Sequence, residues 1–590
     1  MNRNAPCLRK VLWSLVISGF LVSVQAAATL APNASSSGTL SASHTEDWWT
    51  ITTTADGSLT VNISTGDANL LEQDANLFDV DGTTLLVHDG ENGTTSTLAY
   101  SHLLPGTYQV RVYLYSGVGA SYSISNTFTA QPIGNNTEPN DSVAAAATMA
   151  INTSTPGHLG YYGNGFTDAI DWFKITIPSD GMLTITGYSD TTLEADLNLY
   201  DIDGTTALQH DGQVSRTSHV SVPNLKPGTY YFKYYQYSGY GGYTLTSTFT
   251  PQSKANDPEP NDTFTQAMTL DPNATTTGHL GYFTNQIMDT KDWYKIQIPS
   301  DGILRVFIKT DSTLDADANL FDVDGSTQIF HDGRVGDTSI LVMPNLMAGT
   351  YYVKPYVYTG YGGYTITSTF IPQPLANDAE PDDTLSKAQA LTMNQTGQGH
   401  LGYYSNGKTD IYDWFSIVQS TTGPLWVSVG SDSTLDADCD MFSASDLSTV
   451  SHDGQSGIHS YVGKDTLAAG TYLVRVKAYT GYGGYKIVAA SQQIAVGTHQ
   501  GLRQAIFKEI FASRATENGA VSLIFALKKP GFGSVRMYTA SGRLVGQVFK
   551  GPIEAERRYE ATVHGISNGI YYAVLSTGEA NKVLRISLTR

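Results

Sequence analysis

The stretch DWFKITIPSDGMLTITG, residues 171–187, has the alternation of period two that is typical of β-strands on both sides of a turn. One face of the first strand is formed by Trp172, Lys174 and Thr176, and the other by Phe173, Ile175 and Ile177. Pro178-Ser179-Asp180-Gly181 predicts the turn, because Pro, Asp and Gly each suit a turn position. The alternation then resumes at Leu183, Ile185 and Gly187. The stretch therefore predicts two strands joined by a turn, and no helix.

The same block of sequence occurs four times in the chain, and its last three copies keep a constant spacing. An acidic motif of the form Glu-Pro-Asn/Asp-Asp begins at Glu138, Glu259 and Glu380, at intervals of 121 residues. An Asp-Trp pair follows at the same interval, at Asp171, Asp292 and Asp413, with an earlier outlier at Asp47. A period this long, with its own turns and apolar strands, is typical of domains that fold one by one.

Short strands separated by turn signals within each block predict an all-β fold of tandem antiparallel β-sandwich domains, jelly-roll-like in character. We expect them at residues 27–130, which lack the acidic motif, and at 131–251, 252–373 and 374–491, and we number them repeats 1 to 4. A linker at 492–502 is expected to precede a small Ig-like β-sandwich at 503–590.

The N-terminus has the composition of a cleaved secretory signal. Basic residues precede an apolar run at 11–24, and small residues follow before Ala27, so residues 1–26 are predicted to be a signal peptide. Cys7 would leave with it, and the one remaining thiol, Cys439, has no partner for an internal disulfide. No other stretch is apolar for long enough to span a bilayer. The protein is therefore expected to be secreted or held on the outer cell surface.

The formal net charge of -20 is unevenly distributed along the chain. Residues 28–499 contain 48 acidic and 18 basic side chains, a net charge of -30, and residues 500–590 contain 6 and 13, a net charge of +7. The signal adds +3, which restores -20. An acidic array of this kind argues against nucleic-acid binding and against unaided docking on anionic membranes. Its carboxylates either form a solvated surface or gather around cations.

Four motifs together resemble the bacterial pre-peptidase C-terminal domain family. They are Glu-Pro-Asn-Asp, Asp-Trp-Phe/Tyr, Leu-Asn-Leu-Tyr/Phe-Asp and Pro-Asn-Leu-x-x-Gly-Thr-Tyr-Tyr, and the resemblance covers residues 28 to about 490 in four copies. It implies β-sandwich modules of the kind appended to secreted peptidases and other extracellular proteins. It also implies calcium, since relatives in collagenases bind calcium and collagen.

Calcium takes six to eight oxygen ligands, and repeats 2 to 4 offer a dense supply of them. If the segment that leads into each repeat folds back on its first strand, as the resemblance implies, the ligands are Glu138, Asn140, Asp141, Asp168 and Asp171 in repeat 2, Asp257, Glu259, Asn261, Asp262, Asp289 and Asp292 in repeat 3, and Asp378, Glu380, Asp382, Asp383, Asp410 and Asp413 in repeat 4. Alternatively, these Asp and Asn residues cap turns and the Pro begins the domain.

Repeat 1 lacks the acidic motif, and His44 stands three residues before Asp47. We therefore predict that it binds no calcium. A second acidic pattern, Asp201-x-Asp203-Gly204, recurs at Asp79 and Asp322. It lacks the remaining ligands and the closing Glu of an EF-hand loop, so it is predicted to be a hairpin turn.

Catalytic motifs are missing from the sequence. His88, His210, His331 and His452 each precede Asp-Gly, but adjacent residues on a strand point to opposite faces, so a copied turn explains them better than a His/Asp pair. His158, His279 and His400 recur in His-Leu-Gly and are expected to be structural. There is no Gly-x-Ser-x-Gly, His-Glu-x-x-His or phosphate loop. The protein is therefore predicted not to be an enzyme.

A late strand of repeats 2 and 3 carries so many tyrosines that they cannot all point inward when side chains alternate between faces. Exposed tyrosine on a rigid sheet suits stacking on sugars or gripping a fibrous protein. The ligand-binding candidates are Tyr235, Tyr237, Tyr240, Tyr356, Tyr358, Tyr361 and Tyr482. The alternative is a half-buried tyrosine ladder that covers a thin sandwich.

The tail resembles the C-terminal sorting domain of the type IX secretion system, most clearly in the Gly542-Arg543 turn and the Gly569-Ile570-Tyr571 strand. A flagellar-hook-capping-type Ig-like domain shares this pattern. The resemblance implies that the outer-membrane secretion machinery is a partner of the chain.

Together these patterns predict a secreted or cell-surface, non-catalytic, calcium-stabilised protein that binds an extracellular polysaccharide or fibrous protein or mediates adhesion. The alternatives are a structural spacer or surface-layer component without a specific ligand, and a secreted hydrolase with an unrecognised site.

Overall fold

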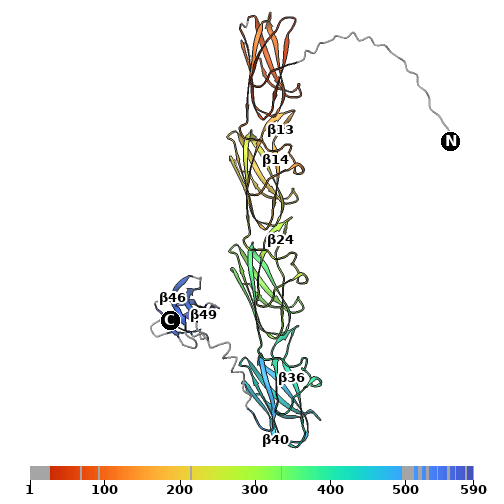
Figure 1. The fold of residues 1–590 in the computed structure, drawn as a ribbon, viewed down its shortest axis with the longest axis vertical. Coiled ribbons are helices and arrows are strands. Elements are labelled where there is room, and N and C mark those ends of the chain that lie inside the picture. Colours follow the sequence, from red (N-terminus) through yellow and green to blue (C-terminus); the bar gives the residue numbers. More distant parts are fainter. Residues whose placement is uncertain are drawn as a thin grey trace, which may run out of the picture.

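A computed structural model of the chain describes residues 27–494 except 67–68, 91–92, 213–214 and 334, and residues 511–588 except 516–520, 526–530, 541–542, 554–558, 565 and 578–580. The predicted signal peptide and most of the predicted linker lie outside the described residues. Four β-sandwiches follow one another in a row (Figure 1). The prediction of an all-β chain of tandem sandwiches is confirmed.

Repeat 2 has the strands that its sequence pattern predicts. Its first sheet has the order β10 (Ala147–Thr148), β14 (Ile170–Ile177), β19 (Gly228–Gly239), β16 (Leu193–Tyr200) and β17 (Ala207–Asp211). Its second sheet has the order β11 (Ser154–Leu159), β20 (Gly241–Pro251), β15 (Gly181–Ser189) and β18 (Thr217–Leu225), followed by β23 and β24 of the next repeat. Phe173, Ile175 and Ile177 point into the core and are buried, as the alternation predicts.

The other repeats have the same arrangement. Repeat 1 consists of β1 (Ala28–Thr29), β2 (Ser35–Thr39), β3 (Glu46–Thr53), β4 (Gly57–Thr65), β5 (Leu71–Phe78), β6 (Leu85–Asp89), β7 (Thr95–Leu103), β8 (Gly106–Gly117) and β9 (Ser121–Ala130). Repeat 3 consists of β21 (Met268–Thr269), β22 (Thr275–Leu280), β23 (Phe283–Thr284), β24 (Ile287–Met288), β25 (Tyr294–Ile298), β26 (Gly302–Thr310), β27 (Leu314–Phe321), β28 (Gln328–Asp332), β29 (Thr338–Leu346), β30 (Gly349–Gly360) and β31 (Gly362–Pro372). Repeat 4 consists of β32 (Gln389–Ala390), β33 (Thr396–Leu401), β34 (Tyr404–Ser405), β35 (Lys408–Thr409), β36 (Tyr412–Gln419), β37 (Gly423–Ser431), β38 (Leu435–Ser443), β39 (Thr449–Asp453), β40 (His459–Leu467), β41 (Gly470–Gly481) and β42 (Gly483–Ala490).

A small hairpin joins each repeat to the one before it. In repeat 2 the hairpin is formed by β12 (Tyr161–Gly163) and β13 (Phe166–Asp168), and β12 pairs with β7 of repeat 1. The backbone N–H of Leu104 donates to the carbonyl of Tyr162 at 2.9 Å. The hairpins β23–β24 and β34–β35 extend the sheets of repeats 2 and 3 in the same way. Each hairpin therefore belongs to one repeat by sequence and to the preceding repeat by hydrogen bonding.

Short 3-10 helices follow the acidic motifs, at η1 (Val143–Ala145), η2 (Phe264–Gln266) and η3 (Leu385–Lys387). The C-terminal domain has a sheet of β43 (Phe511–Ala515), β44 (Val521–Phe525) and β47 (Tyr559–Val563), and another of β46 (Leu544–Ile553), β45 (Gly531–Thr539), β48 (Gly569–Thr577) and β49 (Asn581–Leu588). Among the described residues, no helix has the length and apolar character needed to cross a membrane.

Candidate metal centres and exposed tyrosines

The segment leading into each of repeats 2 to 4 folds back on the first long strand. The N–H of Trp172 donates to the carbonyl of Asn140 at 2.9 Å, and that of Trp293 donates to Asn261 at 3.0 Å. This return places the acidic motif beside the aspartate that precedes the tryptophan. The peptide bond between Glu138 and Pro139 is cis, as are the equivalent bonds in repeats 3 and 4.

In repeat 2, carboxylate oxygens of Glu138, Asp168 and Asp171 lie within 4.8 Å of one another. Asp171 is fully buried and accepts hydrogen bonds from the hydroxyl of Tyr243 and, at 3.1 Å, from Nδ2 of Asn136. The Asn140 amide faces Asp171 and Glu138. Three carboxylates and an amide therefore converge on one point between the leading segment and the sandwich.

Repeat 3 has a cluster at the equivalent place, formed by Asp257, Glu259 and Asp292. Asn261 donates from Nδ2 to Asp257 at 2.7 Å, and the hydroxyl of Tyr364 donates to Asp292 at 2.6 Å. Lys226 of repeat 2 forms an ion pair with Asp289 beside this cluster, with 3.4 Å between Nζ and Oδ2.

Repeat 4 groups four carboxylates, those of Asp378, Glu380, Asp382 and Asp413. The hydroxyl of Tyr485 donates to Asp413 at 2.5 Å, and Nε2 of Gln389 donates to Asp382 at 2.9 Å. Asp382 and Asp413 are fully buried.

Many oxygens in and beside these clusters have no hydrogen-bond donor. Buried oxygens without one belong to Asp168, Asp257, Asn261, Asp292, Asp378, Asp382, Asp410 and Asp413. A buried polar atom without a partner costs about 1–3 kcal/mol, and more when it is charged. Hard oxygens in this number, with no histidine or cysteine among them, suit Ca²⁺ rather than Zn²⁺. The residues present therefore fit a calcium ion in each of the three clusters.

Burial and mutual repulsion raise the pKa of the clustered carboxyl groups. Desolvation, followed by the charge of Asp171, raises the pKa of Asp168 to about 9. Desolvation, followed by Glu380, raises the pKa of Asp410 to about 9. Desolvation is also the main cause that holds the pKa of Asp292 well above its usual value. A divalent cation would remove this penalty by compensating the charges.

The clusters do not gather every predicted ligand. Asp262 and Asp383 are exposed, Asp141 is half-buried, and Asp289 and Asp410 are buried beside the clusters; none of the five belongs to the grouped carboxylates. Asn136 and the tyrosines at 243, 364 and 485 lie in or beside the clusters but were absent from the predicted set. The 121-residue interval could have found Asn136, because it aligns with Asp257 and Asp378.

Repeat 1 places a histidine where the others have an aspartate. Nε2 of His44 lies 2.6 Å from Oδ1 of Asp47, and the hydroxyl of Tyr122 donates to Oδ2 at 2.7 Å. Nε1 of Trp49 donates to the same hydroxyl at 2.8 Å. Both oxygens of Asp47 therefore have partners from the protein itself.

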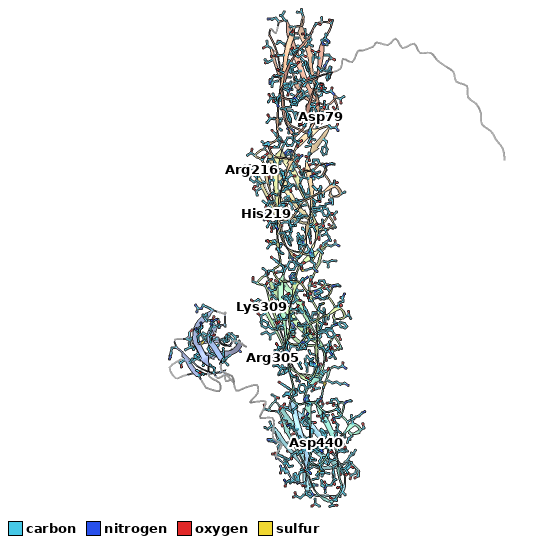
Figure 2. The ribbon with its side chains drawn as sticks, viewed as in Figure 1. Asp79, Arg216, His219, Arg305, Lys309 and Asp440 are labelled. Carbon is cyan, nitrogen blue, oxygen red and sulfur yellow. The ribbon has the colours of Figure 1, made fainter. Side chains whose placement is uncertain are left out.

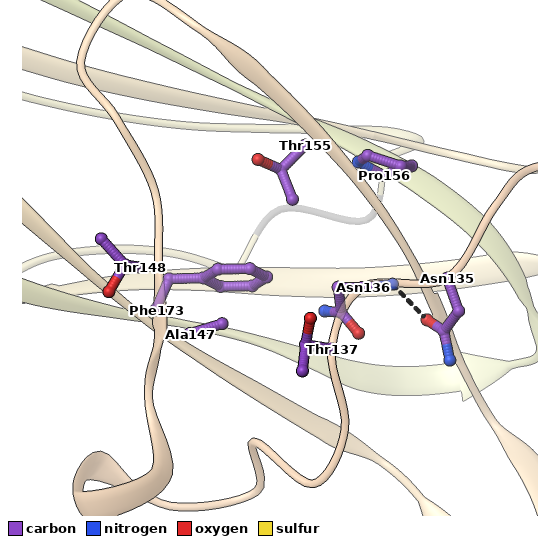
Figure 3. Close-up of a pocket in the computed structure, with 8 residues that line it drawn as sticks. All are labelled: Asn135, Asn136, Thr137, Ala147, Thr148, Thr155, Pro156 and Phe173. Atoms are coloured by element: carbon purple, nitrogen blue, oxygen red, sulfur yellow. Dashed lines mark hydrogen bonds between the residues drawn. The ribbon is translucent and has the colours of Figure 1, made fainter.

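A cavity of about 420 Å³ lies beside the cluster of repeat 2 (Figure 3). The leading segment forms one wall, and the edge strands β10 and β11 and the ring of Phe173 form the rest; the lining residues are Asn135, Asn136, Thr137, Ala147, Thr148, Thr155, Pro156 and Phe173. The leading segment is therefore incompletely packed on the edge of the sandwich at this point.

The candidate tyrosines divide by exposure. Tyr237 and Tyr358 are 67% and 62% exposed. Tyr235 and Tyr356 are half-buried, and each donates to an aspartate of the neighbouring strand at 3.1 Å. Tyr240, Tyr361 and Tyr482 are half-buried and pack edge-on against Tyr161, Tyr282 and Tyr403.

Two further tyrosines are exposed at the equivalent position, Tyr115 by 64% and Tyr479 by 60%. All four stand where the pairing of the long strand shifts by one residue, for example between Glu194 and Ala195 opposite Tyr237. A β-bulge leaves one residue unpaired and re-aims its side chain. Each repeat therefore presents one tyrosine to solvent by the same backbone irregularity.

The histidine and aspartate of the copied His-Asp-Gly sequence lie at the end of a strand (β6, β17, β28 or β39) and not in the turn that was predicted. In repeat 4, Nδ1 of His452 lies 2.5 Å from Oδ1 of Asp440 on the neighbouring strand. Nδ1 of His88 and His331 contacts Asn76 and Asn319 at 2.7 and 2.8 Å, across the strand pair. The following aspartates instead accept backbone N–H groups, as Asp332 does from Ile340 at 2.6 Å.

Comparison with known proteins identifies one of the repeats. Residues 169–236 match the family model of the bacterial pre-peptidase C-terminal domain. This match lies in repeat 2 and runs from β14, which carries Asp171, through most of β19, so repeat 2 contains a pre-peptidase C-terminal domain.

The chain also matches solved structures, three of which are the following. The pre-peptidase C-terminal domain of a collagenase from Bacillus anthracis is 21% identical over 19% of this chain and 100% of that chain, with a TM-score of 0.16. A β-glucuronidase from Parabacteroides merdae is 10% identical over 32% of this chain and 28% of that chain, with a TM-score of 0.15. The BSP domain of a biofilm associated protein is 9% identical over 90% of each chain, with a TM-score of 0.11.

Proposed function

We propose that the protein is a secreted or cell-surface, non-catalytic rod that binds an extracellular polysaccharide or fibrous protein, and that calcium at repeats 2 to 4 holds its domains together. The matched domain is typical of secreted bacterial proteins. The observation that carries the binding proposal is the exposed tyrosine that stands at the same β-bulge in all four repeats.

An exposed tyrosine on a strand is a rigid platform. Its ring offers a large contact area with a polar tip, at a low cost in conformational entropy, so it suits the face of a sugar ring or an extended peptide. Four such rings in a row of tandem domains suit a ligand that is itself a repeating polymer, because each further contact is made at a high effective concentration.

Calcium has a structural role in this proposal. The residues that would hold the ion are Glu138, Asp168 and Asp171 in repeat 2, Asp257, Glu259 and Asp292 in repeat 3, and Asp378, Glu380, Asp382 and Asp413 in repeat 4. Bound calcium would compensate the buried charges and fasten the leading segment to the sandwich. The free energy of binding would thereby stabilise the folded repeat.

The C-terminal domain is proposed to be a sorting domain that the type IX secretion machinery recognises. Its support is the resemblance of the Gly542-Arg543 turn and the Gly569-Ile570-Tyr571 strand, together with a basic character opposite to that of the repeats. Its β-sheets would then serve export, and the four repeats would carry the function outside the cell.

Co-sedimentation tests the binding proposal. The mature chain is mixed with insoluble cellulose, chitin, xylan or collagen in calcium, and the unbound fraction is measured. We expect retention on at least one polymer and its loss when Tyr115, Tyr237, Tyr358 and Tyr479 are replaced by alanine. Tyr188→Ala is the matched control, because Tyr188 is 53% exposed on another sheet and has no copy in the other repeats.

A spacer without a specific ligand is the second candidate. It is favoured by the burial of several of the tyrosines, since Tyr230 and Tyr234 of β19 and Tyr243 of β20 are fully buried. Failure of the mature chain to sediment with any of the four polymers would favour this spacer.

A further inference from the structure

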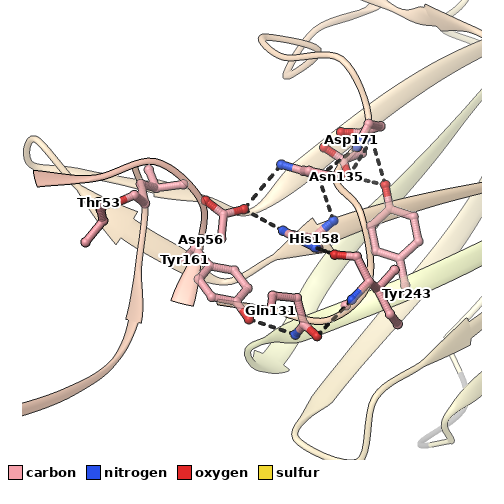
Figure 4. A network of polar contacts seen from close by, with 12 residues as sticks. Thr53, Asp56, Gln131, Asn135, His158, Tyr161, Asp171 and Tyr243 are labelled. Carbon is pink, nitrogen blue, oxygen red and sulfur yellow. Dashed lines mark hydrogen bonds and ion pairs between the residues drawn. The ribbon is translucent and has the colours of Figure 1, made fainter. Parts of the chain in front are cut away.

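Hydrogen bonds join each repeat to the next. Carboxylates of the upstream repeat accept them, and we call this surface the acceptor face. A histidine and a hairpin turn of the downstream repeat donate them, and we call this surface the donor face. Figure 4 shows the first junction, where His158 of repeat 2 lies against Asp56 of repeat 1. Nδ1 of His158 is 2.6 Å from Oδ2 of Asp56, and Nε2 is 2.6 Å from the carbonyl of Ile133. Both side chains are buried. Because a carbonyl oxygen only accepts, Nε2 carries a proton, and the ring bridges the two repeats.

The same bridge closes the other two junctions. Nδ1 of His279 is 2.7 Å from Asp180, and Nδ1 of His400 is 2.9 Å from Asp301. The other ring nitrogen of each histidine contacts a backbone carbonyl at 2.8 Å. The histidines of the His-Leu-Gly motif therefore have a structural role between domains.

A second carboxylate of each acceptor face accepts hydrogen bonds from backbone N–H groups in the turn of the hairpin. Asp79 accepts the N–H groups of Asn164 and Gly165, both at 2.8 Å, and Figure 2 shows it at the end of repeat 1 that faces repeat 2. Asp322 accepts those of Asn406 and Gly407 at 3.0 and 2.9 Å.

Asp201 holds the middle hairpin through the N–H of Gln286 at 3.2 Å. Asp79, Asp201 and Asp322 are completely buried. A side-chain amide adds a further hydrogen bond at the second and third junctions. Nδ2 of Asn224 donates to the carbonyl of Gly281, and Nδ2 of Asn345 donates to that of Gly402, both at 2.7 Å.

Repeat 4 has neither these acceptor carboxylates nor the donor amide. The equivalent positions in repeat 4 lie 121 residues further along the chain than those in repeat 3. Thr422 stands there in place of Asp301, Ser443 in place of Asp322, and Thr466 in place of Asn345, and the residues of repeat 2 at these positions are Asp180, Asp201 and Asn224.

Repeat 1 lacks the donors. Gly38 pairs with Tyr122 as Gly157 pairs with Tyr243, so Thr39 stands where repeat 2 has His158. A short turn closed by Ser41 and His44 replaces the hairpin.

We propose that repeats 1 and 4 are the caps of a head-to-tail interface, in which two buried carboxylates mark each acceptor face and a histidine with a hairpin turn marks each donor face. A head-to-tail interface that is open at both ends propagates into filaments, and repeat arrays need atypical end repeats to stop this. With the acceptor half missing from repeat 4 and the donor half missing from repeat 1, a second copy of this chain finds no complementary end.

The physical basis is the cost of an unpaired buried polar group. A donor face docked on repeat 4 would bury its histidine and two turn N–H groups against threonine and serine, without carboxylates. Docked on repeat 3, the same surface has carboxylate acceptors for the histidine and both N–H groups. Docked on repeat 2, it has them for the histidine and one N–H group. The loss of the acceptor carboxylates therefore makes docking on repeat 4 unfavourable, because buried donors would be left without partners.

Hydrogen exchange of the mature chain tests the acceptor carboxylates. In the variant Asp180→Asn/Asp201→Asn, we expect the amides of 283–288 to exchange at least tenfold faster, with 161–168 and 404–409 unchanged. Asp271→Asn/Asp446→Asn removes the same two charges from exposed positions and is expected to change none of the three hairpins. Unchanged protection at 283–288 in the first variant overturns the assignment.

A five-repeat chain tests the cap. A second copy of residues 252–372 is inserted after Gln493, with Met288→Leu in the copy so that its peptides differ in mass. We expect the hairpin of the added copy to exchange at least tenfold faster than the native one. Thr422→Asp/Ser443→Asp/Thr466→Asn in repeat 4 should restore its protection. A protected added hairpin behind native repeat 4, or an unprotected one behind the restored repeat, contradicts the proposal.

Discussion

At the scale of single residues, three buried aspartates carry the calcium proposal. Asp171, Asp292 and Asp413 each accept a tyrosine hydroxyl on one oxygen, and burial holds the pKa of each well above its usual value. In Asp292 and Asp413 the other oxygen has no donor. The tyrosine fixes the carboxylate so that its free oxygen points into the cluster.

Asp292→Asn removes one charge from repeat 3 and keeps an acceptor for Tyr364. We expect calcium bound per chain to fall from three ions to two, because the remaining ligands no longer compensate the ion. The melting temperature in calcium should fall by several degrees, since 1 kcal/mol corresponds to about 4 °C in a domain of this size. Metal analysis and calorimetry measure both, with exposed Asp271→Asn as the control. Three ions retained by Asp292→Asn would disprove the site.

The raised pKa values set the pH dependence of the calcium-free protein. Burial raises the pKa of Asp168 and Asp410 to about 9 and that of Asp289 and Asp378 to about 8. In the folded chain these groups keep protons that the unfolded chain loses above about pH 4. The free energy of unfolding in chelator should therefore fall as pH rises from about 4 to about 9.

Calcium should reverse this trend, because it binds the ionised carboxylates and displaces their protons. The increase in melting temperature on adding calcium should thus grow with pH over the same window. Thermal melts at several pH values, with chelator and with calcium, measure it. A calcium effect that shrinks as pH rises would contradict the clusters as its origin.

The sequence predicted most of each cluster because acidic motifs and Asp-Trp pairs recur in phase. It did not predict which carboxylates converge, since Asp262 and Asp383 turn to solvent although they stand beside Asn261 and Asp382. The sequence also did not predict which of the tyrosines are exposed and which are half-buried. Alternation predicts that some rings are exposed, but the bulge that exposes Tyr237 leaves no signal in the periodicity.

At the scale of elements, the hairpins were the part of the fold that the sequence pattern could not show. Strands such as β23 (Phe283–Thr284) have only 2 residues, too few for a period to appear. Their pairing with the preceding repeat is decided by contacts with residues more than 50 positions away, such as Asn224 to Gly281. The long strands, in contrast, are all visible as alternating stretches between turn residues.

Two glycines test how tightly the junction elements approach. Gly281 has a φ of +81°, and a Cβ there would lie 2.4 Å from the carbonyl oxygen of Gly360. Gly407 has a φ of +71° with open space around it. Gly407→Ala should cost about 1 kcal/mol for the left-handed backbone alone. Gly281→Ala should cost at least about 1 kcal/mol more, because backbone atoms must move. Equal losses in chemical denaturation would contradict the close approach.

At the scale of the whole molecule, the four exposed tyrosines are expected to act together on a polymer. Linked weak contacts gain affinity through effective concentration, so replacing one ring should weaken retention modestly and replacing all four should abolish it. Binding isotherms on the retained polymer for Tyr237→Ala, the double variant with Tyr358→Ala and the quadruple variant measure this series. Full loss on replacing Tyr237 alone would point to a single site.

Calcium is expected to bind in three of the four repeats, because His44 occupies the position of a ligand in the first. The most direct measurement is the calcium content of the mature chain after dialysis against buffered calcium, by elemental analysis with protein quantified in the same sample. The account predicts three ions per chain, and two after Asp413→Asn. An absence of bound calcium, or an ion in repeat 1 as well, would contradict it.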